Sequence, residues 1–257
     1  MPEGDTIHAA ARRVGAALVG AGPVEVETPQ RRHALDRWPE RLAGRAVRSV
    51  DAHGKHLFLR FEGDLTLHSH LRMGGLWSVY EKGRRWRRSP RRAWLVLRTK
   101  EADVVQFDGP VLELLTDARS RLTAARLGPD VLAPGFDRAE ALRRMREDDP
   151  TRGLGDALLD QRSVAGIGNI WKSESCFGAA LDPWRPLAEV SDEEILSVLA
   201  VAAERMGESL ERYGGHPRDI AVYERAGRPC PRCGTRIRAR GQGDDNRTTW
   251  WCPGCQR

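Results

Sequence analysis

The chain has 257 residues, of which 40% are apolar, so it is long enough for one large or two modest domains with a substantial core. Its 42 Lys and Arg residues outnumber its 36 Asp and Glu residues, and the net charge of +6 is common among proteins that bind phosphate-rich partners. The chain start has no apolar signal core and no apolar run reaches bilayer length, so we expect no secretion signal and no membrane partner.

The first predicted element is a helix over residues 5–19, because apolar side chains recur there at helical spacing and Gly20 is a suitable stop. The period then changes to short, often alternating apolar runs that Gly, Asp and Pro interrupt. Strands at this density favour an antiparallel sandwich or barrel. We predict them at residues 24–26, 47–50, 57–61, 65–70, 76–80, 93–98 and 103–107.

Beyond a linker at residues 132–137, which contains Pro134-Gly135, the patterns are helical. Helices are predicted over 138–146 and 155–163, another begins near Asn169, and a capping box at Ser191–Glu194 opens a long one. We therefore expect an α+β fold, in which a leading helix and an antiparallel β-sandwich precede a helical domain and a small C-terminal module.

Four cysteines define that module. Cys230 and Cys233 form one C-x2-C pair, Cys252 and Cys255 form another, and 18 residues separate the pairs. Each pair can bind one side of a tetrahedral ion, so the spacing predicts one structural Zn²⁺. Such a zinc-bound module can serve only to stabilise the end of the chain, or it can present the surrounding arginines to a partner. Thiols kept for a metal indicate a reducing cytoplasm, and the fifth cysteine, Cys176, fits a buried apolar position.

Three segments are candidates for binding phosphate. Gly166-Ile167-Gly168-Asn169 precedes a helix, whose N-terminus attracts anions, although a tight turn would explain the glycines equally. Lys55 stands beside Gly54 at a strand start, where a solvated turn lysine is the simpler interpretation. Residues 83–92 form a basic loop that could add affinity for a phosphate backbone or be merely solvated.

Four histidines lie close to Lys55 in the sequence. Their spacing allows a metal site, but no carboxylate has a compelling spacing to them, and we interpret them as strand residues. They are His53, His56, His68 and His70.

The chain start carries a less obvious signal. Removal of Met1 would leave Pro2 as a terminal secondary amine. An α-amino group has a pKa of about 8, against about 10.4 for lysine, so more of it is unprotonated and nucleophilic at neutral pH. Glu3 next to it is suited to acid–base chemistry. Most proteins that begin Met-Pro make no use of the proline, so this motif gains weight only in combination with others.

In combination, the motifs resemble the formamidopyrimidine-DNA glycosylase / endonuclease VIII family of base-excision repair enzymes. The resemblance covers essentially the whole chain, in the family's order. The matching segments are Pro2-Glu3-Gly4, Gly54-Lys55-His56-Leu57, His70-Leu71-Arg72-Met73-Gly74-Gly75, Leu158-Leu159-Asp160-Gln161, Ala165-Gly166-Ile167-Gly168-Asn169-Ile170, Val222-Tyr223-Glu224-Arg225-Ala226-Gly227 and the four cysteines.

The resemblance implies three domains: a catalytic β-sandwich with its leading helix over residues 1–131, a helix–two-turns–helix domain over 132–222, and a β-hairpin zinc finger over 223–257. It also implies a bifunctional glycosylase and lyase that binds damaged double-stranded DNA, and single strands as an open alternative. We expect a monomer in the cytoplasm, associated with the nucleoid.

Catalytic roles follow from the same resemblance. Pro2 would attack C1′ of the damaged nucleotide and displace the base, and the resulting iminium would drive β- and δ-elimination. Glu3 would protonate the sugar ring oxygen as the ring opens, and Lys55 would hold a neighbouring phosphate. The base must leave the stack first, because C1′ is otherwise inaccessible.

The expected DNA contacts also come from the family. Asn169 and the backbone at Gly168 would hold a phosphate, and Arg247 of the zinc finger would clamp phosphates at the lesion. Met73, next to Arg72, matches the apolar wedge that fills the vacated space. Glu174 matches an acidic position near the active site, with a role that the resemblance does not define.

Departures from the family's patterns bear on the substrate. The start of the chain resembles the endonuclease VIII branch, and residues 106–111 lack the Arg-x-Phe wedge of the other branch. Gly74 replaces the aromatic residue of the usual endonuclease VIII wedge, and residues 213–219 are short where a loop would cap an oxidised purine. We therefore expect oxidised pyrimidines and abasic sites as substrates, in the manner of actinobacterial endonuclease VIII-like enzymes. The alternatives are an abasic-site lyase with little glycosylase activity and a non-enzymatic protein that binds damaged DNA.

Overall fold

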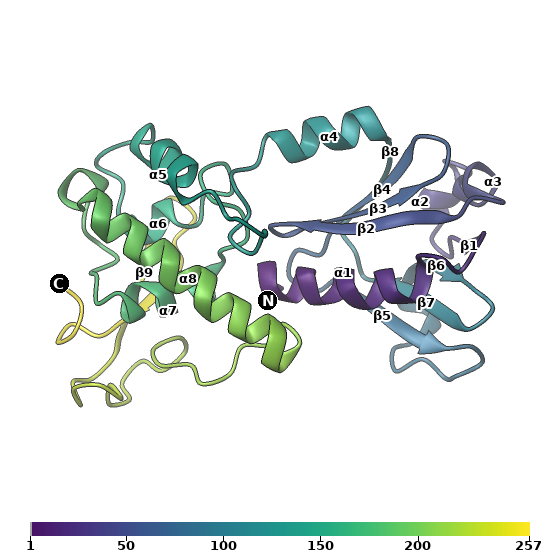
Figure 1. The fold of residues 1–257 in the computed structure, drawn as a ribbon. Coiled ribbons are helices and arrows are strands. Elements are labelled where there is room, and N and C mark those ends of the chain that lie inside the picture. Colours follow the sequence, from purple (N-terminus) through teal and green to yellow (C-terminus); the bar gives the residue numbers. More distant parts are fainter. Residues whose placement is uncertain (1) are drawn as a thin grey trace. The chain divides into compact units, whose positions relative to one another are not determined.

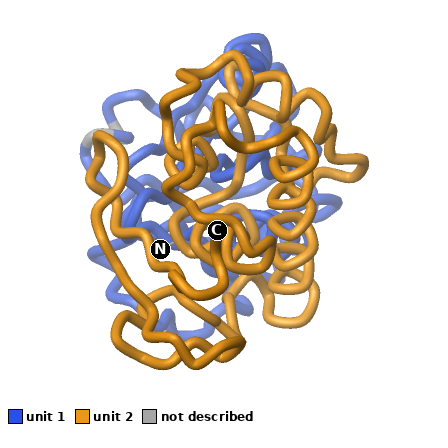
Figure 2. Tube along the Cα trace, turned by 90° about the vertical axis from the view of Figure 1, so that its left-hand side faces the viewer, with its two compact units in different colours: residues 1–2, 6–125 blue, residues 3–5, 126–257 orange. Residues whose placement is uncertain are grey.

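A computed structural model describes residues 2–257, which divide into two compact units (Figure 2). Unit 1 holds Pro2 and Thr6–Ala125, and unit 2 holds Glu3–Asp5 and Arg126–Arg257. The division places three residues of the chain start with the C-terminal half of the sequence. The three expected domains, with boundaries after residues 131 and 222, stay a prediction.

Unit 1 is built on two four-stranded antiparallel sheets (Figure 1). One sheet has the strand order β1 (Glu25–Glu27), β6 (Ala93–Arg98), β7 (Ala102–Phe107), β5 (Leu76–Glu81). The other has the order β2 (Val47–His53), β3 (His56–Phe61), β4 (Leu65–His70), β8 (Val111–Thr116). All pairings between these strands are antiparallel, and short turns connect the consecutive neighbours β2–β3, β3–β4 and β6–β7.

The helix α1 (Gly4–Leu18) contributes its apolar stripe to the same core as both sheets. Ile7, Val14 and Leu18 from the helix are buried with Leu59 of β3 and Leu97 of β6. The predicted leading helix and sandwich are therefore confirmed.

Several elements of unit 1 were not predicted. The strand β8 is a short apolar run, for which helix and strand cannot be told apart by periodicity. The helix α4 (Asp117–Ala125) has hardly any apolar stripe. The remaining elements are short helical turns between strands: α2 (Arg31–Ala34), α3 (Trp38–Leu42) and the 3₁₀ turn η1 (Pro90–Arg92).

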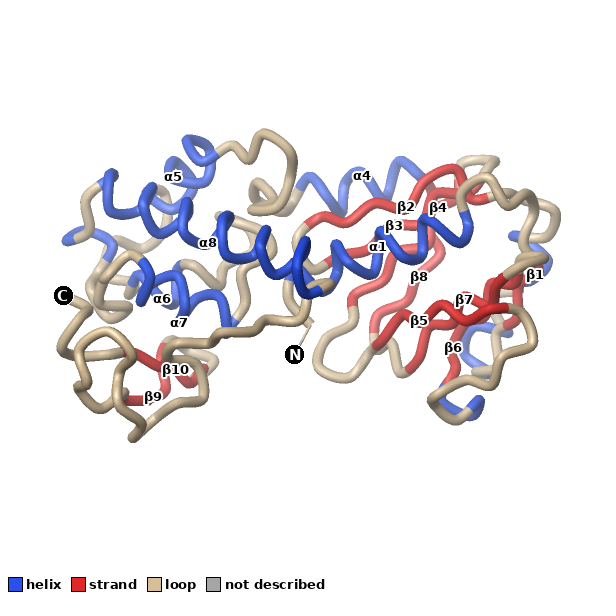
Figure 3. The backbone as a smooth tube through the Cα atoms, turned by 60° about the horizontal axis from the view of Figure 1, so that its bottom comes forward, coloured by secondary structure: helices blue, strands red, loops and turns tan. Residues whose placement is uncertain are grey.

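Unit 2 is mainly helical (Figure 3). Its elements are α5 (Arg138–Arg146), α6 (Leu154–Ala157), α7 (Asn169–Gly178), the 3₁₀ turn η2 (Leu187–Glu189) and α8 (Asp192–Tyr213). Their apolar faces enclose a second core, in which Leu158, Ile167, Trp171, Leu199 and Met206 are buried. No helix among residues 2–257 is long and apolar enough to span a membrane.

The helix predicted over residues 155–163 is wrong beyond Ala157, where α6 ends. Two turns follow before α7, and Gln161 stabilises them because its side chain accepts from Gly166 N and donates to Ile167 O. This helix–turns–helix segment brings the Gly-rich stretch to the N-terminus of α7, whose start near Asn169 is confirmed.

The C-terminal hairpin consists of β9 (Arg238–Gln242) and β10 (Arg247–Trp251). It has a small core of its own, in which Ile237, Cys230 and Cys252 pack with Phe177 of α7 and with Val222. The α+β class, the sandwich, the helical part and the terminal hairpin are thus all confirmed.

The long helix α8 begins with the expected capping box. Ser191 Oγ accepts from Glu194 N at 3.3 Å, and Glu194 Oε2 accepts from Ser191 N at 2.8 Å. Ser191→Ala should lower the free energy of unfolding by about 1 kcal/mol, because the N–H of Glu194 loses its acceptor, whereas Ser191→Asp should retain most of the stability. Urea unfolding measures both. Ser89→Ala is the control, because Ser89 is exposed and its side chain makes no cap. An equal loss in both alanine variants would contradict the assignment.

Candidate active site

The side chain of Glu3 is docked on the N-terminus of α7. It is 1% exposed, and its carboxylate accepts hydrogen bonds from Gly168 N at 3.0 Å, Ile170 N at 2.8 Å and Trp171 N at 3.3 Å. The first turn of a helix offers unpaired N–H groups and a positive dipole end, which is where a carboxylate is most stabilised. The helix terminus that the sequence suggested for phosphate thus holds a carboxylate from 165 residues upstream.

Glycines permit this docking. A Cβ on Gly168 would lie 2.3 Å from Cδ of Glu3, and a Cβ on Gly4 would lie 2.9 Å from Cα of Gly166. Gly4 N donates to Gly166 O at 3.0 Å, so the two backbones touch directly. The motif's glycines are therefore required by a close approach of two chain segments.

Asp5 completes the attachment of the chain start. Its Oδ2 accepts from Ser209 Oγ of α8 at 2.7 Å, and both residues are buried. Pro2, which is partly buried, directly precedes this fixed segment. Met1, whose removal we expect, lies outside the described residues.

Asn169 connects α7 to the hairpin. Its Nδ2 donates to Thr248 O of β10 at 2.9 Å. Its Oδ1 is buried and has no hydrogen-bond partner. A buried polar atom without a partner is uncommon in a stable interior and needs a reason, such as a group that binds there.

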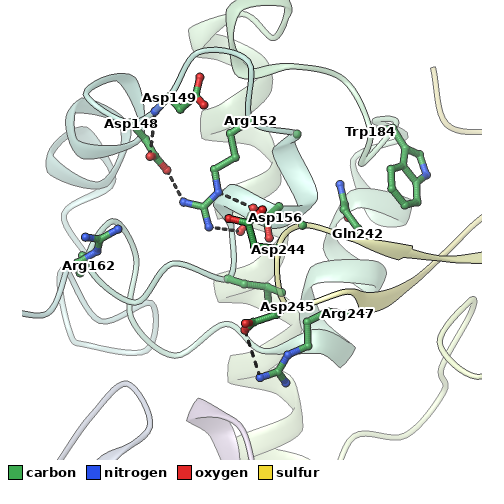
Figure 4. Close-up of a pocket in the computed structure, with 13 residues that line it drawn as sticks. Asp148, Asp149, Arg152, Asp156, Arg162, Trp184, Gln242, Asp244, Asp245 and Arg247 are labelled. Atoms are coloured by element: carbon green, nitrogen blue, oxygen red, sulfur yellow. Dashed lines mark hydrogen bonds and ion pairs between the residues drawn. The ribbon is translucent and has the colours of Figure 1, made fainter.

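Arg247 is the first residue of β10, and its side chain is 47% exposed. It contributes to a polar cleft of about 710 Å³ between the 148–162 segment and the hairpin turn (Figure 4). The guanidinium of Arg152 in that cleft is bound to Asp148 and Asp156, so its charge is used internally. Arg247 has only a longer contact of 3.7 Å to Asp245, which leaves it available for an exchange of partners.

Lys55 lies in unit 1, in the turn between β2 and β3. The predicted placement of the histidines on strands is confirmed. His56 Nδ1 is 2.8 Å from His68 Nε2, and His68 Nδ1 is 3.1 Å from Glu113 Oε2. Burial, followed by the charges of neighbouring histidines and Arg72, lowers the pKa of His56 to about 3. This imidazole is therefore neutral at physiological pH.

Arg72 and Met73 follow β4. Arg72 has a φ of 49°, and its backbone N donates to His70 Nδ1 at 3.2 Å. Burial and the nearby Arg72 and Lys55 charges lower the pKa of His70 to about 4. Met73 is 70% exposed, which is unusual for a large apolar side chain and compatible with a wedge.

The four cysteines come together as their spacing predicted. Their Sγ atoms all lie within 4.8 Å of one another, with Cys230–Cys255 at 3.8 Å and Cys233–Cys252 at 3.5 Å. A tetrahedral zinc with Zn–S bonds of about 2.3 Å requires S–S separations of about 3.8 Å, so the site fits Zn²⁺. Within residues 2–257 these thiols are the one group of three or more His, Cys, Asp or Glu side chains close enough to share an ion.

Cys176 and Glu174 on α7 are both fully buried. Burial raises the pKa of the Cys176 thiol to about 12, as expected for an inert apolar position. The Glu174 carboxylate accepts from the backbone N of Ala221, Val222 and Tyr223 at 2.8–3.0 Å. These bonds hold the segment before the hairpin against α7, and the expected proximity of Glu174 to DNA stays a prediction.

Lys172 was missed by the sequence analysis. It is 0% exposed, and its Nζ donates to Thr249 Oγ1 of β10 at 2.6 Å. A lysine in a helix is usually solvated, so the residue type gave no signal. Its spacing did carry one, because positions three after Asn169 and four before Cys176 share the packed face of α7.

Two protein-family models match the chain. The formamidopyrimidine-DNA glycosylase N-terminal domain matches residues 1–119, and the H2TH domain of the same glycosylase matches residues 127–219. The first covers α1 and the sandwich, and the second covers the helical segment around α7.

Several relatives match along almost all of their length. A probable endonuclease 8 of Streptomyces coelicolor is 42% identical, over 100% of this chain and 94% of the relative. A DNA-(apurinic or apyrimidinic site) lyase of Mycolicibacterium smegmatis is 35% identical, over 100% and 99%.

A solved structure shares the fold. The formamidopyrimidine-DNA glycosylase of Lactococcus lactis, solved in non-covalent complex with DNA that contains an abasic site, has a TM-score of 0.84 at 22% identity and covers 99% of both chains. Together with the relatives and the family models, this fold shows that the chain belongs to the formamidopyrimidine-DNA glycosylase / endonuclease VIII family of DNA-repair enzymes.

Proposed function

We propose that the protein is a bifunctional DNA glycosylase and abasic-site lyase of base-excision repair, acting on damaged double-stranded DNA. The observation that carries this proposal is the docking of Glu3 on α7, which fixes a carboxylate immediately after Pro2. A protein that only binds damaged DNA would not need its chain start held in this way.

Pro2 is the proposed nucleophile once Met1 has been removed. Its nitrogen forms a bond to C1′ of the damaged nucleotide while the bond from C1′ to the base breaks, and the base leaves as an anion that takes a proton from solvent. The amine then loses its N–H proton as the sugar ring opens to an iminium. Glu3, the next residue in the chain, can take that proton and deliver it to the ring oxygen.

Strand cleavage follows from the iminium. Its positive charge cannot be discharged by loss of an N–H proton, because the nitrogen of Pro2 is then fully substituted. Loss of a C2′ proton expels the 3′ phosphate, and a second elimination expels the 5′ phosphate. A terminal amine has a pKa of about 8, which makes this chemistry accessible at neutral pH without deep burial.

Phosphate contacts would hold the nucleotide in place. We propose that Lys55, Asn169 and Arg247 bind the backbone of the DNA, and that Glu174 lies near the same site. The expected phosphate contact of the Gly168 backbone would require its N–H, which Glu3 holds, to exchange partners. Arg247 is supported by its half-exposed guanidinium and long contact to Asp245. Asn169 would have to offer a phosphate its Nδ2, which donates to Thr248 O in this structure. Met73, exposed after Arg72, would fill the space that the flipped base leaves.

We propose oxidised pyrimidines and abasic sites as the main substrates. The support is that residues 106–111 lack the Arg-x-Phe wedge of the formamidopyrimidine branch, and several relatives bear the name endonuclease 8. An abasic-site lyase with little glycosylase activity is the second candidate, because one relative bears the name of such a lyase. Excision assays on thymine glycol, dihydrouracil and 8-oxoguanine duplexes, alongside abasic DNA and single strands, separate the two.

We also propose one structural Zn²⁺ per chain, held by Cys230, Cys233, Cys252 and Cys255, and a monomer that works at the nucleoid in the cytoplasm. The domain boundaries proposed above, after residues 131 and 222, place the zinc finger directly after the segment that Glu174 holds.

Borohydride trapping tests the enzymatic proposal. Protein with Met1 removed should form a reduced covalent adduct with abasic and thymine-glycol duplexes, because borohydride reduces the iminium to a stable amine. A tag retained before Pro2 should abolish the adduct, since an amide nitrogen is not nucleophilic. An adduct of undiminished yield in the tagged protein would contradict the role of Pro2.

Gly168→Ala tests the docking of Glu3. The new Cβ would overlap the carboxylate, which must then leave the α7 terminus, and a displacement of about 1 Å can cost about 100-fold in rate. We expect a loss of that order in single-turnover base removal. Gly207→Ala on α8 is the matched control, because its Cβ would meet no atom within 4 Å. Equal rates for the two variants would show that Glu3 docking is dispensable.

Cys252→Ser tests the metal. The variant should lose its zinc, measured by elemental analysis, and its affinity for damaged duplex, because the hairpin that carries Arg247 folds around the ion. Cys176→Ala should keep both. Retention of wild-type affinity by the zinc-free variant would show that the finger is not needed for binding.

A further inference from the structure

A charged amine lies in the interior of unit 2 without the usual carboxylate partner. Lys172 is fully buried on α7, and its Nζ donates to the hydroxyl of Thr249 at 2.6 Å. Burying an ammonium group is unfavourable unless nearby groups compensate for the lost water. A lysine kept in such a place requires a reason beyond helix packing.

The hydrogen bonds around Lys172 run in one direction. Thr249 donates its single hydroxyl proton to Gln242 Oε1 at 2.7 Å, so its lone pairs face Lys172. Gln242 Nε2 in turn donates to Pro183 O at 2.7 Å. Thr249 and Gln242 are 0% and 6% exposed. This chain of bonds ties α7 to both strands of the hairpin and to the segment before η2.

Arg247 lies next to the residues that form these hydrogen bonds. It pairs with Gln242 in the β9–β10 ladder and stands two residues before Thr249. Asn169, one turn before Lys172 on the same helix, binds the carbonyl of Thr248. Two side chains of α7 thus hold two successive residues of β10, directly after Arg247.

We propose that Lys172 is a positioning residue, which locks the hairpin onto α7 so that the guanidinium of Arg247 is held in place for a DNA phosphate. The inference rests on the proposed function, because it assigns Arg247 a phosphate. Lys172 itself touches neither the DNA nor the reacting atoms, and it acts through Thr249 and the strand that carries Arg247.

The charge of Lys172 is titratable in an accessible range. Burial lowers its pKa to about 8, against the attraction of Cys176 on the same helix, Asp156 of α6 and Glu3, while Arg247 adds to the lowering. The amine is therefore charged below about pH 8 and neutral above it. A phosphate bound at Arg247 compensates the positive charge there, so it favours the charged amine. DNA binding should weaken as the pH rises through 8, with uptake of a proton on binding at pH 8–9.

The test uses the full-length zinc-loaded protein and a duplex with a tetrahydrofuran abasic analogue, which binds but cannot form an iminium. Lys172→Met should raise the dissociation constant at pH 7 about tenfold and reduce the slope of log K against log salt by about 0.9, the value for one lost phosphate contact. Lys172→Arg should restore the slope and remove the part of the pH dependence between 7 and 9 that Lys172 contributes, leaving only the contribution of the Pro2 amine. Lys100→Met, which removes an exposed lysine of unit 1, is the charge-matched control and should leave the pH dependence intact.

A double-mutant cycle tests whether Lys172 acts through Arg247. In an Arg247→Ala background, Lys172→Met should change the dissociation constant less than about twofold, because the group that it positions is gone. Independent, additive effects would overturn the proposal. The maximal rate of base removal should stay within about threefold in Lys172→Met while the KM rises, since Pro2 and Glu3 remain in place.

Thr249 supplies a second route if Lys172→Met does not fold. Thr249→Val removes the hydroxyl that links Lys172 to Gln242. It should reproduce the smaller slope of log K against log salt at unchanged zinc content, and Thr249→Ser should restore that slope because it keeps the hydroxyl. The inference would be overturned if Lys172→Met or Thr249→Val kept the wild-type dissociation constant, the wild-type slope of log K against log salt and the wild-type pH dependence. Absence of a borohydride adduct in the wild type would instead defeat the proposed function, and the two failures are thus distinguishable.

Discussion

The interaction on which the site depends is the carboxylate of Glu3 at the N-terminus of α7. Three backbone N–H groups converge on it, and Gly166 and Gly168 allow the backbone to come close enough. Such an interaction is strong because the helix dipole and the hydrogen bonds act together in a buried setting. It fixes a segment that would otherwise fray as a chain end, and it determines where the nitrogen of the preceding residue can be.

The helix α7 also organises the rest of unit 2. Its first residues hold the chain start, Asn169 and Lys172 hold β10, and Glu174 holds the segment that leads into the hairpin. Glu3, which follows the candidate nucleophile, and the strand that begins with Arg247 are therefore both fixed to one ten-residue helix. The four thiols beside the hairpin lie at a spacing that fits a tetrahedral ion, and an ion bound there would hold the hairpin folded and so give these attachments a defined partner.

Local chemistry made much of the fold predictable. The cysteine spacing, the Ser191–Glu194 capping box and the stripe of the first helix each report on neighbouring residues, and all three are present in the structure. The strand β8 and the helix α4 escaped prediction because neither has a distinct period, and the helix expected at 155–163 ended early because Gln161 stabilises turns there.

The site was less predictable than the fold, because its contacts join distant parts of the chain. Nothing in the sequence around Gly168 indicates that its N–H faces a carboxylate 165 residues away. The resemblance identified Glu3 and Asn169 as important, but not that one docks on the helix and the other binds β10. Lys172 and Glu174 are of residue types that are usually solvated, and apart from the helical spacing of Lys172 nothing in their local sequence indicates their burial.

The central claim is that the chemistry starts at the nitrogen of Pro2, next to the docked Glu3. Its most direct test is peptide mass spectrometry on the borohydride-reduced complex of the Met1-processed protein with abasic DNA. The claim predicts that the sugar remnant is attached to the N-terminal peptide, at the nitrogen of Pro2. Attachment at a lysine, such as Lys55 or Lys172, would contradict it.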